Sequence, residues 1–352
     1  MSQPLPEIRD EWFGEPSPAC HVAVVSRGRL ARNLAGFPFA PHSAPEALRE
    51  ARRHIDLAVQ RAPELAGWQR VELGALEPMD RTFLKEARLI SKELERGGEE
   101  AAVYIAPDFR ASLLVNEEDH IRLQVMRPGR QVGEVLEQLT ALDEALSRVL
   151  TFAWSERHGY LTACPTNVGT GFRASVMLHL PALALLREVD ASLAGVAHYG
   201  LTVRGYYGEN SEHLGDFYQL SNEITLGRTI EQIVQILEDV VGRVIEKEEE
   251  ARISLFEHHS VTAEDCIWRS FALLAHARKM ESSEAMRLLS QLRLGLDKGY
   301  FDGLSHHDLN RLMVEIQPAH LERLRQKGGA AATRDEARAV HLRKLLARGG
   351  AA

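Results

Sequence analysis

The sequence has few cysteines and no long apolar run. Its cysteines, Cys20, Cys164 and Cys266, lie far apart in the 352 residues, so they form neither a disulfide framework nor a zinc pattern. No apolar stretch approaches the roughly 20 residues that cross a bilayer. The first residues also lack the basic start and apolar core of a signal peptide. We therefore expect a cytoplasmic protein without a membrane segment.

Lysine is scarce as well, although the chain is rich in charge. Only 7 of the 42 basic residues are lysine, and 35 are arginine. Arginine is the better residue for bidentate contacts with phosphate, but a compositional bias of the genome could produce the same excess. The net charge of −8 argues against a general nucleic-acid binder.

Hydrophobic periodicity divides the chain into a leader and two units. Residues 1–20 contain four prolines and form an irregular leader. Residues 21–256 mix strand-like and helix-like patterns, whereas residues 257–352 show helical periodicity only, which predicts an α+β domain followed by an all-helical domain. We expect helices at 45–65, 80–96, 133–150, 181–193, 229–258, 262–280, 282–294, 305–326 and 333–347, and strands at 21–25, 71–74, 101–106, 118–125, 173–180, 199–204 and 216–225.

One cysteine lies in a turn directly before a strand. Cys164 is followed by Pro165, Gly169 and Gly171, and residues 173–180 then alternate between polar and apolar side chains. A thiol beside open backbone amides, with an arginine on the polar face of the next strand, suits the binding and transformation of an anion. A buried, unreactive cysteine in a hairpin fits the same pattern.

Arginine recurs on the polar faces of the predicted strands. Arg27 and Arg29 share one face of an extended segment, a spacing that suits a polyphosphate. Arg122, Arg173 and Arg204 each lie on the polar face of a separate strand. A basic surface loop, or an exposed sheet face with cross-strand ion pairs, would account for any one of them. Their repetition favours an anion site.

An acidic cluster, Glu-Glu-Asp at 117–119, precedes Arg122. The polar members of the alternation that follows are Glu118, His120, Arg122 and Gln124. A strand face with an acid, an imidazole, a guanidinium and an amide suits the lining of a site. The cluster could instead hold a metal, but a cation site built from adjacent residues needs loop geometry, and here a strand is expected.

Four motifs resemble the ATP:guanidino phosphotransferase superfamily and occur in its order. They are Ser-Arg-Gly-Arg at 26–29, Asn-Glu-Glu-Asp-His at 116–120, Cys-Pro-Thr-Asn-Val-Gly-Thr at 164–170 and Arg-Gly-x-x-Gly-Glu at 204–209. The close match is with the bacterial protein-arginine kinase branch. The small-molecule phosphagen kinases carry a helical domain before the first motif, where only 25 residues stand here, and they lack such a helical tail.

The resemblance implies a catalytic domain with a curved antiparallel sheet flanked by helices, so the expected fold class is α+β. It implies that Glu118 and Glu209 bracket the guanidinium of an arginine side chain, with Cys164 beside it. ATP and Mg²⁺ are the implied cofactors, the metal being held by phosphate oxygens and water rather than by protein side chains. The residues expected to bind ATP are Ser26, Arg27, Arg29, Arg88, Arg122, Arg173, Ala174, Ser175, Val176, Met177, Arg204, Gly205 and Gly208.

The chain departs from the family in two places. The family's Ser-Ser-Arg-aliphatic-Arg reads Val-Ser-Arg-Gly-Arg at 25–29, so the backbone geometry at Gly28 could differ. Where the protein-arginine kinases have Glu-Lys-His-Leu-Ile-Ser near the adenine, residues 86–91 read Glu-Ala-Arg-Leu-Ile-Ser. Arg88 either replaces the histidine against the nucleotide or faces solvent.

The last predicted helix begins with a motif of mixed charge. Thr333 is a natural N-cap, and Arg334 and Arg338, four residues apart, share a helix face. A solvated first turn with local salt bridges fits these residues. However, Arg-Asp-x-x-Arg-Ala at 334–339 resembles the motif through which this kinase branch binds phosphoarginine allosterically. The allosteric residues implied by this resemblance are Arg334, Asp335, Arg338 and Ala339.

The motifs together predict a protein-arginine kinase that transfers the γ-phosphate of ATP to arginine side chains. The resemblance implies that such marks direct unfolded proteins to a Clp-type protease and relieve a heat-shock repressor. It also implies a homodimer and a zinc-binding activator protein. We expect no membrane partner and no direct nucleic-acid partner. The alternatives are a small-molecule arginine kinase and an inactive phosphoarginine-binding module, although the intact set of Glu118, Cys164 and Glu209 argues against lost catalysis.

Overall fold

The computed structural model describes residues 17–205, 214–326 and 333–347. Eight strands form one sheet in the order β2-β3-β4-β5-β1-β8-β10-β9, and every neighbouring pair is antiparallel, which confirms the predicted sheet. A separate two-stranded ribbon pairs β6 with β7. The strands are β1 (Ala23–Arg32), β2 (Gln69–Glu72), β3 (Ala102–Ile105), β4 (Ala111–Val115), β5 (Ile121–Pro128), β6 (Trp154–Ser155), β7 (Gly159–Tyr160), β8 (Phe172–His179), β9 (Leu201–Arg204) and β10 (Phe217–Asn222).

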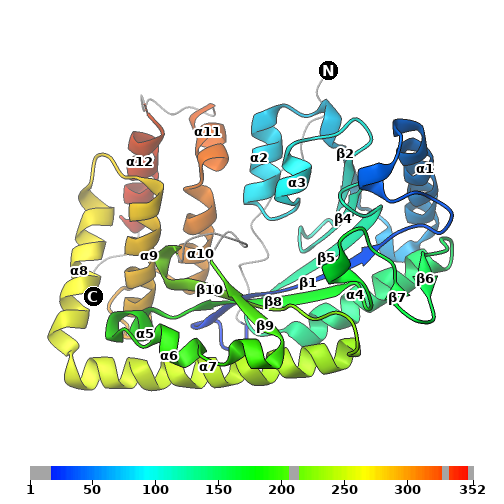
Figure 1. Cartoon of the computed structure of the whole chain (residues 1–352). Coiled ribbons are helices and arrows are strands. Elements are labelled where there is room, and N and C mark those ends of the chain that lie inside the picture. Colours follow the sequence, from blue (N-terminus) through cyan, green and yellow to red (C-terminus); the bar gives the residue numbers. More distant parts are fainter. Residues whose placement is uncertain (1–16, 206–213, 327–332, 348–352) are drawn as a thin grey trace.

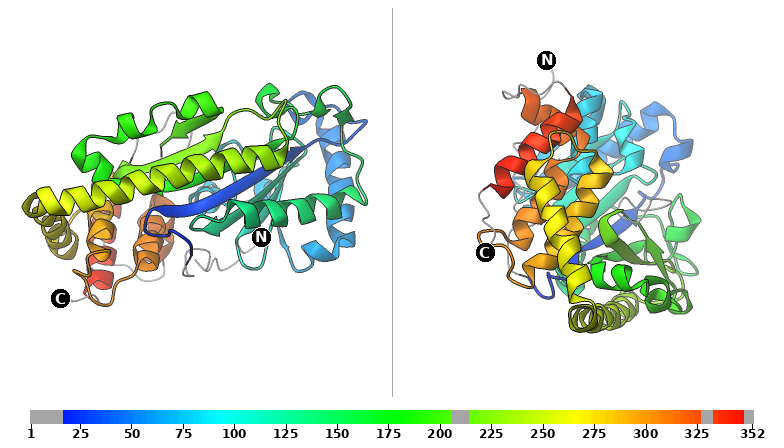
Figure 2. Two further views of the ribbon diagram at one scale, coloured as in Figure 1. Left: turned by 90° about the horizontal axis from the view of Figure 1, so that it is seen from below. Right: turned by 90° about the vertical axis from the view of Figure 1, so that its left-hand side faces the viewer.

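Helices cover both faces of the sheet and extend past one end of it (Figure 1). Two long helices, α4 and α7, run along one face, and Figure 2 shows α7 spanning most of the molecule's length. The last five helices stand together beside one end of the sheet, and α8 follows from the far end of α7. The helices are α1 (Pro45–Arg61), α2 (Pro78–Glu86), α3 (Lys92–Glu95), α4 (Val132–Ser147), α5 (Pro181–Leu186), α6 (Val189–Leu193), α7 (Ile230–His258), α8 (Ser260–His276), α9 (Ser282–Leu296), α10 (His306–Glu315), α11 (Pro318–Gln326) and α12 (Arg334–Leu346).

The described residues form two apolar cores of unequal size. The larger core contains Ile55 of α1, Val135 of α4 and Leu237 of α7. A smaller core joins Leu84 of α2 to Leu114 of β4, on the opposite face. Among the described residues, no helix combines the length and the apolar character that are needed to span a membrane.

Three predicted helices are interrupted by turns. The helix expected at 80–96 breaks at Arg88 (φ 60°), the one at 181–193 at Arg187 (φ 62°), and the one at 305–326 before Pro318. Proline interrupts a helix because its ring clashes with the preceding turn and it lacks an N–H. The other two breaks are left-handed conformations at residues other than glycine, which periodicity does not reveal.

The strand expected at 118–125 begins later than predicted. β5 starts at Ile121, and residues 116–120 form the turn that follows β4. Glu118 therefore lies in a turn, and His120 is buried, where its Nδ1 accepts a hydrogen bond from the backbone N–H of Leu34 at 3.2 Å. The predicted common face holds for Arg122 and Gln124 only.

Gly28 lies in the regular part of β1, where the close approach of α4 leaves no room for a side chain. It pairs with Val125 and with Ala174 on the two neighbouring strands, so the proposed change of backbone geometry is not observed. A Cβ at Gly28 would lie 2.6 Å from side-chain atoms of Val135 and Leu139 of α4. Because side chains alternate along a strand, the neighbouring arginines point to the other face.

Replacing Gly28 by valine should lower the free energy of unfolding by about 1–3 kcal/mol, because the added carbons overlap α4. The denaturant midpoint measures the effect. Gly133→Ala in the same helix is the matched control: nothing lies within 4 Å of the added Cβ, so alanine should stabilise by about 0.5–1 kcal/mol. An unchanged midpoint for Gly28→Val would contradict this account of the packing.

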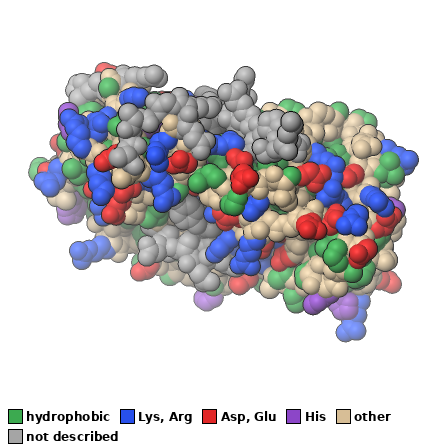
Figure 3. All heavy atoms as spheres, turned by 90° about the horizontal axis from the view of Figure 1, so that it is seen from above, with side chains coloured by type: hydrophobic (Ala, Val, Ile, Leu, Met, Phe, Trp, Pro, Cys, Tyr) green, Lys and Arg blue, Asp and Glu red, His purple; other side chains and the backbone are tan. Residues whose placement is uncertain are grey.

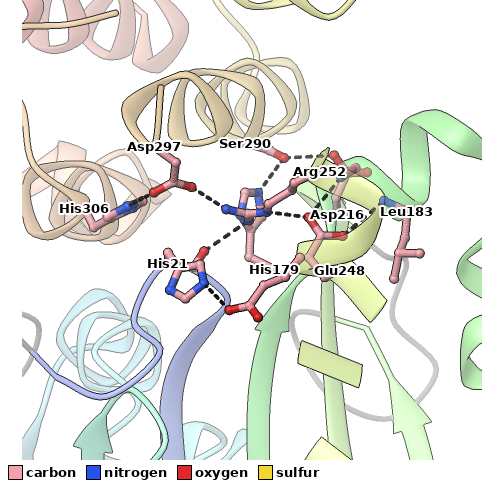
Figure 4. Close-up of polar contacts among 11 residues, drawn as sticks. His21, His179, Leu183, Asp216, Glu248, Arg252, Ser290, Asp297 and His306 are labelled. Carbon is pink, nitrogen blue, oxygen red and sulfur yellow. Dashed lines mark hydrogen bonds and ion pairs between the residues drawn. The ribbon is translucent and has the colours of Figure 1, made fainter. Parts of the chain in front are cut away.

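A buried polar cluster joins the sheet to the helical region (Figure 4). His179, at the end of β8, contacts the Ser290 hydroxyl of α9 through Nε2 at 2.8 Å, and this hydroxyl also contacts Asp216 at 2.8 Å. Nearby, Arg252 of α7 donates to Glu248 at 2.8 Å and pairs with Asp297. Burial, and then the positive charges of Arg293 and Arg252, hold the pKa of His179 well below its ordinary value.

His179 should make folding stability fall as the pH drops below about 6.5. The folded protein keeps this ring neutral, whereas the unfolded chain takes up a proton, so acid favours the unfolded state. The melting temperature should therefore fall less between about pH 7.5 and about pH 5.5 in His179→Asn than in the wild type. The exposed His198 gives the control His198→Asn, which should keep the wild-type difference.

The carboxyls in the same cluster act in the opposite direction at lower pH. Burial raises the pKa of Asp216 and of Glu248, so their protonation on acidification favours the folded state. The wild type, His179→Asn and His198→Asn all keep these two carboxyls. Their effect on the melting temperature is therefore the same in each protein and does not alter the comparison. A wild-type pH difference that persists undiminished in His179→Asn would show that this imidazole is not responsible.

Candidate active site

Arginine side chains from four strands meet on the face of the sheet opposite α4. The register places Arg29 of β1 opposite Arg173 of β8, and Arg122 of β5 opposite Ala31 of β1. Residues directly opposite each other share a face, and Arg204 at the end of β9 completes a pocket of about 170 Å³. The pocket is lined by Arg29, Ala31, Glu93, Glu118, Arg122, Cys164, Thr166, Asn167, Gly171, Arg173 and Arg204.

The arginines destabilise one another's positive charge. Burial, and then the charge of Arg122, lower the pKa of Arg29 to about 10. Burial and the neighbouring Arg29 and Arg88 hold the pKa of Arg27 well below its usual value. Because these guanidinium groups are desolvated and repel one another, an anion that enters the pocket relieves an existing cost.

Two carboxylates from the turn before β5 offset part of this charge. Glu117 lies 2.5 Å from Arg122, and Glu118 pairs with the same guanidinium. Burial alone would lower the pKa of Arg122, but these carboxylates outweigh it and raise the value. The side-chain amide of Asn167 donates to Glu118 at 3.1 Å. Both acids thus pair with Arg122, and the part of the chain described here contains no cluster of three side chains able to hold a metal ion.

Cys164 is held at the edge of the pocket by its own loop. It precedes a short 3₁₀ turn, Pro165–Asn167, and its Sγ lies 3.0 Å from the Thr166 hydroxyl. The buried carboxylate of Asp119 accepts from the backbone N–H of Ala163 at 2.7 Å and from Asn33 at 2.6 Å. Because Asp119 follows Glu118 directly, this contact fixes the thiol and the acid relative to each other.

The remaining residues predicted to bind ATP divide by the direction of their side chains. Ser26 lies on the face away from the pocket, where its hydroxyl donates to the carbonyl of Gly129 at 2.8 Å. Residues 174–177 belong to β8, which pairs on both sides with β1 and β10, so their backbone groups are used in the sheet. Ser175 and Met177 share the face of Arg173, whereas Ala174 and Val176 point into the core.

Arg88 lies beside the arginine cluster. Its side chain is half-buried, and its charge contributes to the lowered pKa of Arg27. Arg88 therefore does not simply face solvent, which was one of the two predicted alternatives. Gly205 ends the described part of this segment, and the predicted Gly208 and Glu209 lie outside the described residues.

The tail motif lies at the start of α12. Thr333 caps the helix and Arg334 is exposed. Arg338 is buried, and its guanidinium donates to the carbonyls of Ile316 at 3.0 Å and Met280 at 2.8 Å. It also pairs with Asp335 at 2.7 Å. The expected common face therefore separates into one exposed and one internal arginine, and Ala339 is also buried.

Several residues of the site were not predicted as site residues. Asn167 and Asp119 stand inside the motifs quoted above, and Gln124 stands on the predicted polar face, so the sequence contained a signal for each. Gln124 accepts a hydrogen bond from Arg27 at 2.8 Å. Glu93 lines the pocket from α3, and nothing in its own segment pointed to the pocket.

Comparison with known proteins places this site in a family. The model of the ATP:guanido phosphotransferase C-terminal catalytic domain matches residues 53–251, and that of the protein-arginine kinase McsB C-terminal domain matches residues 260–351. A protein-arginine kinase of Pelotomaculum thermopropionicum is 41% identical over 99% of this chain and 98% of its own length. One of Moorella thermoacetica is 41% identical over 97% of this chain and 98% of its own.

Solved structures share the fold of the catalytic part. Lombricine kinase superposes with a TM-score of 0.58 at 26% identity, over 70% of this chain and 72% of that one. The duplicated taurocyamine kinase of Schistosoma mansoni, with bound transition state analog components, gives a TM-score of 0.60 at 28% identity, over 68% of this chain. This chain spans 34% of that duplicated protein. The chain belongs to the ATP:guanido phosphotransferase family, in the group that carries the protein-arginine kinase C-terminal domain.

Proposed function

We propose that the chain is a protein-arginine kinase, which transfers the γ-phosphate of ATP to the guanidinium of arginine side chains in proteins. One observation carries the proposal. Four arginines from separate strands line a single pocket together with Glu118 and Cys164. The match to relatives named protein-arginine kinases over nearly the whole length supports a protein as the acceptor.

The arginines form the phosphate end of the proposed site. Arg29, Arg122, Arg173 and Arg204 would bind the triphosphate, with Arg27 beside them, and offset the negative charge that develops during phosphoryl transfer. Mg²⁺ fits this site as an ion bound mainly by phosphate oxygens and water, because Glu117 and Glu118 already pair with Arg122. The metal would neutralise phosphate charge.

The acid and the thiol form the acceptor end. A guanidinium, whose pKa exceeds about 12, is protonated and no nucleophile, so the site must orient it and accept a proton as the N–P bond forms. Glu118 lines the pocket together with Cys164, and by exchanging its pairing with Arg122 for one with the substrate it can fix a substrate arginine in line with the γ-phosphate. We assign Glu209 as the second carboxylate by resemblance, and Cys164 as the group that polarises and positions the guanidinium.

The described part of one face of the molecule carries side chains of both charge signs. In the view from above (Figure 3), Lys and Arg side chains alternate with Asp and Glu side chains over the described part of this face. Such a surface does not select for a partner of one charge sign. From the resemblance, we extend the proposal to unfolded proteins and a heat-shock repressor as substrates, a Clp-type protease that takes up the product, a zinc-binding activator and a homodimer.

A second candidate function is the phosphorylation of a small guanidino compound. The solved structures that share the fold are named lombricine kinase and taurocyamine kinase. The same catalytic fold therefore occurs in those kinases and in the relatives named protein-arginine kinases. The helical region that matches the protein-arginine kinase domain favours a protein acceptor. Comparing free arginine with an arginine-containing unfolded protein as acceptors decides between the two.

The direct test is incubation with ATP, Mg²⁺ and an unfolded protein, which should yield an acid-labile, alkali-stable phosphate on arginine.

Cys164→Ser should lower kcat by about 10²-fold or more, with ATP affinity changed less than about twofold, because the thiol acts on the acceptor. Cys266→Ser in α8, remote in sequence from every pocket residue, is the matched control and should keep the wild-type kcat. An undiminished kcat in Cys164→Ser would refute the role of the thiol, and phosphate on free arginine alone would refute the protein acceptor.

The tail motif gives a separate prediction for phosphoarginine activation. Arg334 is exposed at the start of α12, so Arg334→Ala should abolish the rise in activity that added phosphoarginine causes. Arg269→Ala removes another exposed arginine from the helical region and should leave this activation unchanged. The readout is the ratio of activities with and without phosphoarginine, and an undiminished ratio in Arg334→Ala would contradict the assignment.

A further inference from the structure

The last residue of α2 is a buried carboxylate that holds the start of α11. Glu86 accepts hydrogen bonds from the backbone N–H groups of Ala319 at 3.0 Å and His320 at 3.1 Å. The His320 ring adds a contact through Nδ1 at 2.8 Å, and only 6% of the Glu86 side chain is exposed. A carboxylate on the free N–H groups of a helix N-terminus is favoured by hydrogen bonding and by the helix dipole. In Figure 1, α2 stands beside α11 on the same side of the sheet.

The chain turns sharply directly after Glu86. The N–H of Leu89 bonds to the carbonyl of Leu84 and that of Arg88 to the carbonyl of Lys85, both at 2.9 Å, which is the Schellman pattern of helix ends. The left-handed position in this pattern belongs to Arg88, with a φ of 60°. Glycine usually occupies it, and a side chain there costs about 1–2 kcal/mol. The surrounding contacts must therefore hold the turn in place.

The carbonyl of Arg88 reaches the phosphate site through one side chain. Gln124 donates from Nε2 to this carbonyl at 2.6 Å, and its Oε1 accepts from Nε of Arg27 at 2.8 Å. A carbonyl can only accept and a guanidinium can only donate, so the orientation of the amide is chemically determined. Gln124 is 1% exposed, so water does not compete for either bond.

Arg27 needs such support because its neighbours repel it. Burial and the charges of Arg29, Arg88 and Arg122 all lower its pKa. A long side chain among like charges turns away unless a fixed acceptor holds it, and Gln124 is that acceptor.

We propose that Glu86 is a positioning residue for the phosphate-binding site. Its bond to α11 fixes the Arg88 turn, the turn fixes Gln124, and Gln124 aims Arg27 at the nucleotide. This inference rests on the proposed function, since it assigns Arg27 to ATP. Through this contact the helical C-terminal region sets the geometry of a site to which it contributes no lining side chain among the described residues.

The segment before the same helix start is also held by Arg338 of the tail motif. Arg338 of α12 donates to the carbonyl of Ile316, two residues before α11, at 3.0 Å. An uninterrupted series of contacts thus leads from α12 to Arg27. A shift of α12 that moves the start of α11 acts on Glu86 and therefore on nucleotide binding.

The test measures equilibrium ATP binding by the full chain in Glu86→Ala and in the control Asp80→Ala. Asp80 lies in the same helix and also pairs with α11, through Arg323 at 2.9 Å, but it lies in the first turn of α2, whereas Glu86 is the last residue before the Arg88 turn. Glu86→Ala should weaken ATP binding about tenfold and raise the KM for ATP more than it lowers kcat. Asp80→Ala should change ATP binding less than about twofold. Glu86→Gln, which retains one acceptor oxygen, should give an intermediate loss.

A double-mutant cycle separates positioning from loose docking of α11. Gln124→Leu should weaken ATP binding about as much as Glu86→Ala, and the two changes together should add little to either one. Additive losses, equal losses in Glu86→Ala and Asp80→Ala, or unchanged binding in Glu86→Ala would each overturn the proposal. If the alanine variant of Glu86 does not fold, Glu86→Gln and Asp80→Asn make the same comparison. A wild-type chain that binds no ATP would refute the proposed function instead.

Discussion

The repulsion among buried arginines is the constraint on which the rest of the structure depends. Arg29, Arg122 and Arg173 lie on one face of three adjacent strands, and burial with mutual repulsion lowers the pKa of Arg29 to about 10. Such a face persists only if the strands cannot move apart, and the packing of α4 against the other face helps to hold them together. The contact of Gly28 with Val135 and Leu139 belongs to that packing. Stability supplied by one face thus maintains an unfavourable charge arrangement on the other.

The sequence predicted the residue types of the site better than their surroundings. Alternation placed Arg122 and Gln124 on one face correctly, because a period of two leaves no other choice on a half-buried strand. Alternation wrongly placed Glu118 in the strand, because a turn without glycine can show the same alternation of polar and apolar residues. Helical periodicity failed at Arg88, where the helix predicted at 80–96 breaks, because the composition does not reveal a left-handed arginine. The contact of Glu86 with His320 joins residues far apart in the chain, and no local pattern encodes it.

The helical C-terminal region is tied to the sheet by buried charges rather than by apolar contact alone. Arg252 connects Glu248 to Asp297, and His179 connects β8 to α9 through Ser290. Removing one member of a buried ion pair leaves its partner uncompensated, which costs about 3–5 kcal/mol. Relative movement of the two units therefore carries a high cost at this end of the sheet. The link between α2 and α11 is smaller and built around Glu86 and the Asp80–Arg323 pair, so it is the place where the two regions can adjust.

The position of β1 determines when its pairings can form while the chain is being synthesised. This strand is near the beginning of the sequence but in the middle of the sheet, where Val25 pairs with Pro128 on one side and Met177 on the other. Pairings between residues so distant in sequence form late, since the loop between them must close first. A nascent chain therefore carries Arg29 without its partner strand on one side until β8, with Arg173, has left the ribosome. A chain that ends before β8 lacks Arg173 and Arg204, two of the four arginines that line the pocket.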